Sequence, residues 1–253
     1  MRESCAFTRS AWLPLVQPSF VGGINLFCFP YSGASAAVYQ PWMNSSPNGI
    51  TCVPVELPGH GRRLAEPLSR VLYHLVEGTA AGLLPYLQAP FAFFGHSMGA
   101  LLSFELARLL HDRYGIHPVH LFVSSSAAPH LACTEAPISD LPEGQFVQVL
   151  REMNGMDEAI LACTELRDLL LPILRADFSI CENYRYTPGE RFDFPITAMG
   201  GLGDVYVPHS NLEAWGEHTQ GRFRLRLFPG DHFYLHGSRR LLIETIASSM
   251  LGG

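Results

Sequence analysis

Residues 91–110, FAFFGHSMGALLSFELARLL, join a short apolar run to a longer amphipathic run through the five residues GHSMG. The first run has the length and the continuous apolar character of a buried strand. The second run repeats leucine and phenylalanine at helical spacing over residues 98–114, and Gly115 follows it as a stop signal. A buried strand that passes at once into a helix is the building unit of a parallel sheet covered by helices. This segment therefore predicts an α/β fold.

Other short apolar runs along the chain predict further strands of the same sheet. With 91–95, the candidates are 24–29, 51–57, 119–126, 195–201 and 223–228. Their continuous apolar character is typical of strands covered on both faces. Helix-like segments alternate with them at 67–87, 98–114, 208–219 and 238–251. This alternation predicts right-handed crossovers and a mostly parallel, doubly wound sheet.

The stretch from about 130 to 190 contains no strand candidate. It holds two or three helix-like stretches instead, among them 142–153 and 164–184, and Pro172 lies inside the latter. A segment of this length is too long for a simple connection between two strands. It is either an extra packed layer or a lid over a site, and we favour a lid because ligands bind such sheets at their carboxyl edge. We expect residues 1–253 to form one domain with a helical lid insertion at approximately 130–190.

Composition limits the class of protein further. Apolar residues make up 47% of the chain and charged residues 16%, which is typical of a globular protein. The formal net charge of −6 argues against a nucleic-acid-binding protein, which would need a basic face. No apolar run approaches the length of a transmembrane helix. Pro14, Gln17 and Pro18 interrupt the N-terminal apolar residues, which argues against a signal peptide.

The cysteines are scattered and form no CxxC pair or Cys/His cluster, so we expect neither a disulfide framework nor a zinc site. They are Cys5, Cys28, Cys52, Cys133, Cys163 and Cys181. Cys28 and Cys52 lie in strand candidates, where a cysteine behaves as a small buried apolar residue. This cysteine usage fits a reducing cytoplasm.

The GHSMG turn matches G-x-S-x-G, the pattern of a nucleophile elbow between a strand and a helix. The serine in such a turn is cramped, so its neighbours at two residues' distance must be small, as Gly95 and Gly99 are. The turn exposes Oγ of Ser97, and the following helix offers the backbone N–H of Met98 to a developing oxyanion. The alternative interpretation is that Ser97 only caps the helix.

A serine hydroxyl needs a base to become a nucleophile, and the base needs an acid to orient it. In the α/β-hydrolase fold the chain order is serine, then acid, then histidine. Asp204 follows the strand candidate 195–201, and His232 follows the candidate 223–228. Both lie at the carboxyl ends of strands, on the same edge of the sheet as Ser97. We therefore predict a catalytic triad of Ser97, Asp204 and His232 in an α/β-hydrolase.

Other titratable residues compete for these roles less well. Asp231 is adjacent to His232, so its carboxylate should point away from that ring. His236 is expected in the next loop or helix, and His96 only fills the variable position of the elbow. Glu213 and Glu217 lie on a helix-like segment and are expected in solvent.

The loop FPYSGAS, residues 29–35, follows the first strand and is the expected source of a second oxyanion donor. Its small residues let the backbone approach a ligand closely. We predict the backbone N–H of Tyr31 as this donor, and Ser32 remains an alternative. The segment can also be an ordinary glycine- and serine-containing turn.

Several ordered segments resemble the type II thioesterases that accompany nonribosomal peptide and polyketide synthases. They extend through nearly the whole chain: CFPYSGASAAVYQPW (28–42), VELPGHGRR (55–63), FGHSMGALLSFELARLL (94–110), LPEGQFVQVLREMNGM (141–156), LLLPILRADFSICENYRY (169–186), GGLGDVYVPHSNLEAW (200–215) and FPGDHFYLHG (228–237). Each segment alone is common, and the ordered set is specific.

The resemblance implies a serine thioesterase that acts on acyl groups held on the 4′-phosphopantetheine arm of acyl or peptidyl carrier proteins. Such enzymes remove stalled or wrong acyl units, and some release products. It implies Ser97 as nucleophile, His232 as base and Asp204 as acid, with no cofactor and no metal. The family often has two adjacent aspartates at the acid turn and two glycines before the base. Here Gly203–Asp204 and Gly230–Asp231 stand at those places.

The resemblance also implies a cytoplasmic enzyme whose partners are carrier proteins of a synthase, with neither nucleic acid nor membrane among them. Apolar residues of the lid are candidates to line an acyl tunnel, or else they pack on the body of the domain: Leu169, Leu170, Ile173, Leu174 and Phe178. Other functions remain open on this fold, because fold alone does not fix chemistry. They are a free-standing carboxylesterase, a lipase-like hydrolase, an acyltransferase and a non-catalytic binding module.

Overall fold

Six parallel strands form one sheet at the centre of the molecule, in the order β2-β1-β3-β4-β5-β6. The computed structural model describes residues 10–19, 22–88, 90–131, 136–153, 155 and 158–251. The strands are β1 (Ile24–Phe29), β2 (Ile50–Pro54), β3 (Phe91–His96), β4 (Leu121–Ser124), β5 (Ile196–Gly201) and β6 (Phe223–Phe228). The prediction of a mostly parallel α/β sheet is confirmed, and a strand lies within one to three residues of each predicted boundary.

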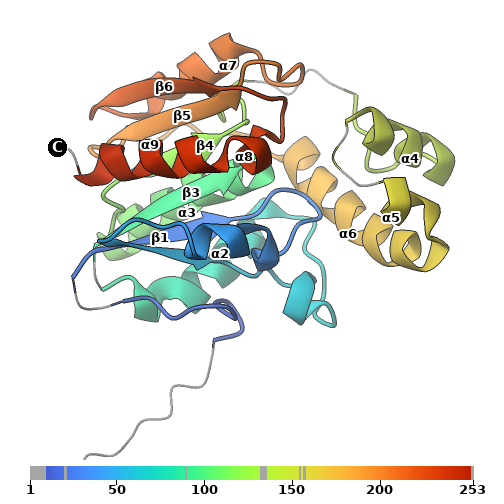
Figure 1. Cartoon of the computed structure of the whole chain (residues 1–253), viewed down its shortest axis with the longest axis horizontal. Helices are drawn as coiled ribbons and strands as arrows, with labels where there is room; N and C mark the ends of the chain where they lie inside the picture. Colours follow the sequence, from blue (N-terminus) through green and yellow to red (C-terminus); the bar gives the residue numbers. More distant parts are fainter. Residues whose placement is uncertain are drawn as a thin grey trace, which may run out of the picture.

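The helices lie between the strands, as the alternation of the sequence predicts (Figure 1). They are α1 (Gln40–Met43), α2 (Leu72–Leu83), α3 (Met98–Tyr114), α4 (Glu143–Glu152), α5 (Glu158–Ala162), α6 (Thr164–Asn183), α7 (His209–Glu213), α8 (Tyr234–Gly237) and α9 (Arg239–Leu251). Short 3₁₀ turns are η1 (Ala36–Tyr39), η2 (Gly61–Arg63), η3 (Leu84–Tyr86) and η4 (Ala214–His218). None of the described helices is long and apolar enough to cross a membrane.

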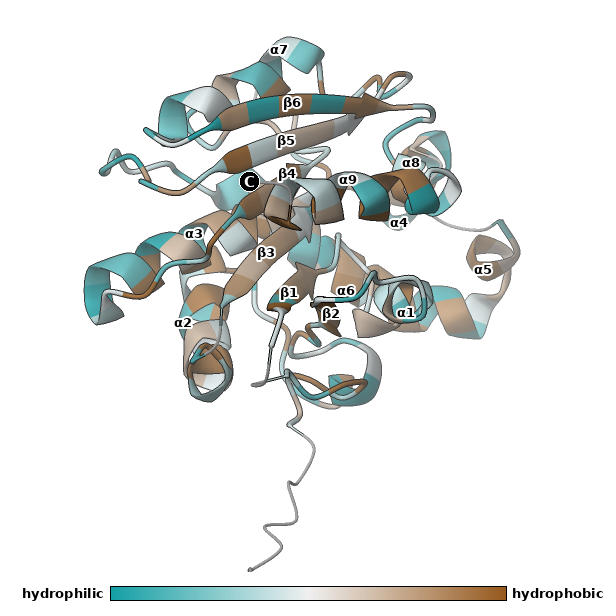
Figure 2. Cartoon of the chain, turned by 60° about the vertical axis from the view of Figure 1, so that its left-hand side comes forward, coloured by the Kyte–Doolittle hydropathy of each residue, from teal (hydrophilic) through white to brown (hydrophobic). Residues whose placement is uncertain are grey.

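Two apolar cores lie on the two faces of the sheet because side chains of a strand alternate between its faces. Phe27 and Phe93 point into the core under α2 and α3, whereas Cys28 and Phe94 point into the core under α9. The central strands are accordingly hydrophobic along their length, and hydrophilic colour returns along the edge strand β6 (Figure 2). Cys28 and Cys52 are buried, as expected. Cys5, Cys133 and the first nine residues lie outside the described residues.

The strand order reverses between β1 and β3, because β2 lies to one side of β1 and β3 to the other. This reversal makes the carboxyl ends of β1 and β3 a topological switch point of the sheet. In open α/β sheets this switch point is where ligands bind. The GHSMG turn follows β3 and the 29–35 loop follows β1, so the order of the strands brings these two segments together.

Helices α4, α5 and α6 follow β4 and gather beyond one end of the sheet (Figure 1). They share a small apolar core of their own, whose buried residues are Phe146, Val147, Leu150, Leu161, Leu171 and Leu174. Pro172 lies inside α6 without ending it. Of the residues considered for an acyl tunnel, Leu174 and Phe178 pack in this small core, and Leu169 is 45% exposed. We call α4–α6 the insertion helices below.

Candidate active site

Ser97 lies in a strained turn between β3 and α3. Its φ of 53° and ψ of −119° are rare for a residue with a side chain. Its side chain forms no capping hydrogen bond to the helix, so the interpretation of Ser97 as a simple helix cap does not hold. The backbone is fixed instead by the N–H of Ser97, which donates to the carbonyl of Ser124 at 2.8 Å. A strained backbone conformation of this kind persists only where many surrounding contacts fix it, and it is often found at functional sites.

The glycines on either side of Ser97 are required by close backbone contacts. A Cβ at Gly95 would lie 2.1 Å from the carbonyl oxygen of Gly99, and a Cβ at Gly99 would lie 2.3 Å from the carbonyl oxygen of Phe29. Gly99 therefore lets the start of the 29–35 loop pack directly against the first turn of α3. We call residues 29–35 the oxyanion loop. The elbow and this loop form one tightly packed unit.

The structure brings Asp204 and His232 into direct contact. Oδ2 of Asp204 lies 2.9 Å from Nδ1 of His232, and the side chains are 1% and 8% exposed. The other carboxylate oxygen accepts the backbone N–H groups of Tyr206 and Val207, at 3.0 and 3.2 Å. Burial alone would raise the pKa of Asp204, but the hydrogen bond and the charge of His232, together with the Tyr206 N–H, hold this pKa below its usual value.

This contact fixes the histidine ring. Since an ionised carboxylate only accepts, Nδ1 of His232 carries the proton, and Nε2 is then the free basic nitrogen. Ser97 and His232 form no hydrogen bond with each other in this structure. Such bonds are often long in the absence of substrate and tighten in the reacting complex.

The competing acids and bases lie where the sequence suggested. Oδ1 of Asp231 accepts the N–H of Phe233 at 2.9 Å, which turns the carboxylate into its own loop. Glu213 and Glu217 are exposed. His236 lies in α8, and its Nε2 is 3.1 Å from the hydroxyl of Tyr31.

The two predicted oxyanion donors have free backbone N–H groups. Among the residues that the structure describes, no acceptor is bound to the N–H of Met98 or of Tyr31. The same is true of Ser32, so this observation favours neither residue of the oxyanion loop over the other. A donor that is unpaired and close to a nucleophile is available to stabilise negative charge.

The comparison with known families decides the class of enzyme. A model of the thioesterase domain matches residues 24–250. The chain belongs to the thioesterase family. It is therefore a hydrolase that cleaves thioesters, which confirms the resemblance found in the sequence.

Relatives of this thioesterase match it over almost its whole length. GrsT, the gramicidin S biosynthesis protein of Aneurinibacillus migulanus, is 41% identical, and the match covers 94% of this chain and 93% of GrsT. RedJ, a thioesterase from the prodiginine biosynthetic pathway in Streptomyces coelicolor, is 36% identical with a TM-score of 0.85 over 94% of this chain and 98% of RedJ. BorB, the type II thioesterase of the borrelidin biosynthetic cluster, is 35% identical with a TM-score of 0.83, covering 91% and 94%.

The structure of the thioesterase adds a residue that sequence reasoning set aside. His96 is fully buried, and its ring centroid lies 5.3 Å from that of His232. Nδ1 of His96 lies 2.8 Å from Oγ of Ser124, which lies 2.7 Å from the hydroxyl of Tyr234. Burial, and then the charges of nearby histidines, hold the pKa of His96 well below its usual value. A neutral imidazole therefore packs against the catalytic candidate, and no sequence signal marks it because it occupies the variable position of the pattern.

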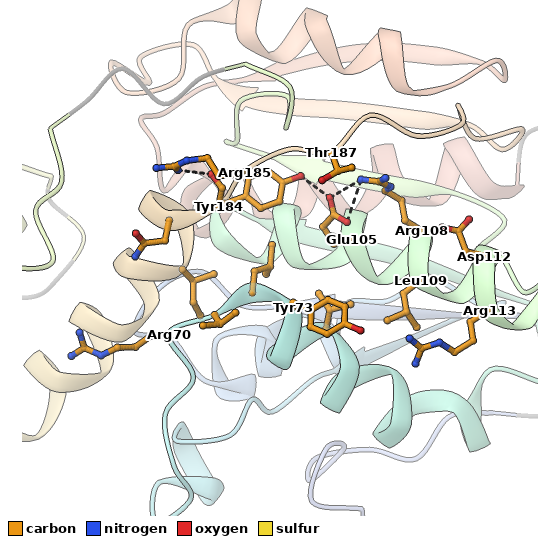
Figure 3. Close-up of a pocket in the computed structure, with 15 residues that line it drawn as sticks. Arg70, Tyr73, Glu105, Arg108, Leu109, Asp112, Arg113, Tyr184, Arg185 and Thr187 are labelled. Atoms are coloured by element: carbon orange, nitrogen blue, oxygen red, sulfur yellow. Dashed lines mark hydrogen bonds and ion pairs between the residues drawn. The ribbon is translucent and has the colours of Figure 1, made fainter.

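One cavity of the thioesterase lies apart from these residues. It has a volume of about 790 Å³ and lies between α2, α3 and the end of α6. On one side of it, the carboxylate of Glu105 accepts hydrogen bonds from the hydroxyl of Tyr184 and the guanidinium of Arg108 (Figure 3). None of the candidate site residues lines it. Within the described ranges, no group of three or more His, Cys, Asp or Glu residues is arranged to hold a metal ion.

Proposed function

We propose that this thioesterase hydrolyses acyl thioesters held on the 4′-phosphopantetheine arm of acyl or peptidyl carrier proteins. In this proposal Ser97 is the nucleophile, His232 is the general base and Asp204 orients it. The backbone N–H groups of Met98 and Tyr31 form the oxyanion hole. The observation that carries the proposal is the 2.9 Å contact between Asp204 and His232, at the same sheet edge as the strained turn of Ser97.

The proposed reaction is a two-step acyl transfer. His232 Nε2 takes the proton of Ser97 as Oγ attacks the thioester carbonyl, and the two backbone N–H groups stabilise the resulting oxyanion. The tetrahedral intermediate collapses with loss of the pantetheine thiolate, which receives the proton from His232. A water molecule, deprotonated by His232, then attacks the acyl-serine. The second tetrahedral intermediate collapses, His232 returns the proton to Oγ of Ser97, and the carboxylic acid is released. The catalytic groups in this proposal are side chains and backbone of this chain.

The biological setting is proposed from the relatives. GrsT, RedJ and BorB each carry the name of a pathway that makes a natural product. We extend this to the present chain as an enzyme that removes stalled acyl units from a synthase or releases its product. Its partners in this proposal are carrier proteins, and its location is the cytoplasm.

The insertion helices are proposed to be a lid that selects the acyl group. They lie beyond the sheet end, and the hydroxyl of Tyr206, next to the acid turn, donates to the carbonyl of Glu152 at the end of α4. The buried cluster of α4–α6 gives these helices an apolar core of their own. If the lid selects the substrate, shortening side chains such as Leu174 will change the preferred acyl length, whereas a purely structural layer will change stability alone.

The test is mass spectrometry of a panel of acyl-loaded carrier proteins, incubated with the native enzyme or with a variant. Ser97→Ala should reduce turnover by orders of magnitude, because only the oxyanion hole and binding remain. Ser103→Ala is the matched control, since Ser103 is a buried serine on the same helix whose hydroxyl donates only to the Ala100 carbonyl. Near-native hydrolysis by Ser97→Ala would refute the assignment.

Three further assays, compared with this panel, separate the alternative functions. A higher kcat/KM on small oxygen esters than on carrier-bound thioesters would identify a carboxylesterase. Transfer of the acyl group to an added alcohol or amine instead of water would identify an acyltransferase. Absence of fluorophosphonate labelling at Ser97 would favour a binding module.

A further inference from the structure

A buried carboxylate of the insertion helices reaches the oxyanion loop. Oδ2 of Asp177, on α6, accepts the backbone N–H of Gly33 at 2.7 Å. The same oxygen lies 2.9 Å from Nε2 of His60, which belongs to the loop after β2. The side chains of His60 and Asp177 are 4% and 2% exposed. Three segments far apart in the sequence therefore meet at a single oxygen atom.

The hydrogen bonds of His60 determine its charge. Nδ1 lies 2.9 Å from the carbonyl oxygen of Pro58, and Nε2 lies 2.9 Å from the carboxylate of Asp177. Both partners are acceptors, so both ring nitrogens carry protons and the ring is an imidazolium. Burial lowers the pKa of His60, but the hydrogen bond and charge of Asp177, with smaller effects of Pro58 and Glu56, raise it overall. Asp177 is thus the counter-ion of a buried cation.

The Gly33 N–H, which donates to Asp177, lies in a tight turn. The N–H of Ala34 donates to the carbonyl of Tyr31 at 3.0 Å, and Gly33 has a φ of +77°. A positive φ at the third residue, with an ordinary φ at Ser32, defines a type II β-turn. Type I and type II turns differ by a flip of the central peptide, whose N–H is that of Gly33. By accepting this N–H, Asp177 selects one orientation of the peptide between Ser32 and Gly33, in the turn that Tyr31 begins.

The packing of α6 against Gly33 favours the same conformation of the turn. A Cβ at Gly33 would lie 2.6 Å from Cδ2 of Leu174, one turn from Asp177 on α6, so the helix and the loop touch directly. The far end of the loop is held by a second buried carboxylate, since Oε1 of Glu56 accepts the N–H of Ala36 at 2.9 Å. Side chains from outside the oxyanion loop therefore fix it at Gly33 and fix Ala36, the residue that directly follows it.

We propose that Asp177 is a positioning residue for the oxyanion hole, which acts through the Gly33 N–H and the buried His60 to hold the turn that carries Tyr31. This inference rests on the proposed role of Tyr31 in the proposed function. It links the insertion helices to the reacting carbonyl, so that α6 has a part in the rate of the reaction as well as in covering the site.

The test compares three variants with the native enzyme. Asp177→Ala removes the acceptor of Gly33 and the counter-ion of His60. Asp177→Asn keeps an acceptor but removes the charge. Glu182→Ala is the matched control, because Glu182 lies on the same helix and accepts the backbone N–H groups of Ile138 and Ser139, away from the oxyanion loop.

The substrate is an acyl thioester of N-acetylcysteamine, which needs no carrier protein, and all assays run below the unfolding temperature of each variant. We expect Asp177→Ala to lower kcat by about 10- to 100-fold with KM within about threefold, because a displaced donor acts on the transition state. Asp177→Asn should lie between Asp177→Ala and native enzyme. Glu182→Ala should keep kcat within about threefold, since its loss affects only stability or KM.

A second readout is the rate at which a small fluorophosphonate labels Ser97, since its phosphoryl oxygen also uses the oxyanion hole. The rate should fall in parallel with kcat for the Asp177 variants. Equal kcat and labelling rates in Asp177→Ala and native enzyme would overturn the inference, as would an equal loss in Glu182→Ala. Failure of the native enzyme to cleave any thioester would instead overturn the proposed function, and the labelling rates would still test the role of Asp177.

Discussion

Gly99→Ala is the substitution for which the structure gives the clearest quantitative expectation. The new Cβ would lie 2.3 Å from the carbonyl oxygen of Phe29 and 2.7 Å from that of Pro30, whereas ordinary contacts begin near 3.4 Å. The atoms must therefore separate by about 1 Å. Both obstacles are backbone, so no side-chain rotation relieves the clash. Either α3 or the start of the oxyanion loop has to move.

Two effects of different size follow from this movement. Overpacking a tight contact costs about 1 to 3 kcal/mol, against which alanine regains up to about 1 kcal/mol of helix propensity. With that propensity regained, the net loss of about 0 to 2 kcal/mol should lower the unfolding temperature by no more than roughly 8 °C in a chain of this size. A 1 Å misplacement of catalytic groups can lower turnover by about 100-fold. We therefore expect the loss of kcat to be much larger than the loss of stability would suggest.

The assay is thioester hydrolysis at saturating substrate, with thermal unfolding followed by circular dichroism on the same samples. Gly144→Ala is the control, because no atom lies within 4 Å of a Cβ at that position in α4. It should keep both kcat and unfolding temperature close to native values. If Gly99→Ala retains kcat within threefold of this control, the close packing of the elbow against the oxyanion loop does not matter for catalysis, and the argument from geometry is refuted.

Further expectations follow from the site and from one buried histidine. Asp204→Asn should lower kcat by about 10³- to 10⁴-fold because it disturbs the tautomer of the base, and Asp231→Asn should change kcat little; equal effects would contradict the assignment of the acid. Tyr31→Phe should change kcat by less than about threefold, since the proposed donor is the backbone N–H and only a side-chain contact is lost. Burial lowers the pKa of His120 to about 4, so its contribution to stability is present above pH 6.5 and is lost as the pH falls towards 4. The free energy of unfolding should fall by about 2 kcal/mol more between pH 7 and pH 5 in the native enzyme than in His120→Phe, as measured by urea denaturation, and equal slopes would contradict this.

The sequence predicts the sheet well because each buried strand must be apolar on both faces, and few other segments meet that demand. The observed strands and helices depart from the predicted bounds where a backbone N–H donates to a distant residue or to a side chain. The strand expected over 51–57 ends at Pro54, and the N–H of Glu56 donates to the carbonyl of Trp12 at 2.8 Å. The helix expected from 67 begins at Leu72, because the Ser69 hydroxyl accepts the N–H of Val71 and holds an extended turn.

The pairing of Asp204 with His232 could be predicted because the order of strands in this fold fixes which loops meet. Their catalytic roles, and the donor role of Tyr31, stay predictions that the variants above test. The link between His60 and Asp177 could not be predicted in the same way. The two residues are 117 positions apart, and neither belongs to a spacing that indicates a contact. A single aspartate on an amphipathic helix usually faces solvent, and only the packing of α6 against the oxyanion loop buries this one.

A buried ion pair is a weak source of stability, because removing two charges from water costs about as much as their attraction returns. An apolar pair of the same shape in place of His60 and Asp177 would often be as stable. Such a pair would leave the Gly33 N–H without an acceptor, however, and the peptide would lose the hydrogen bond that favours its present orientation. The polar pair is therefore better explained by the position of the oxyanion loop than by the stability of the fold. On this reasoning a double variant with leucine at both positions would unfold at a temperature close to native while its kcat falls, and a parallel fall of both would show that the pair is structural.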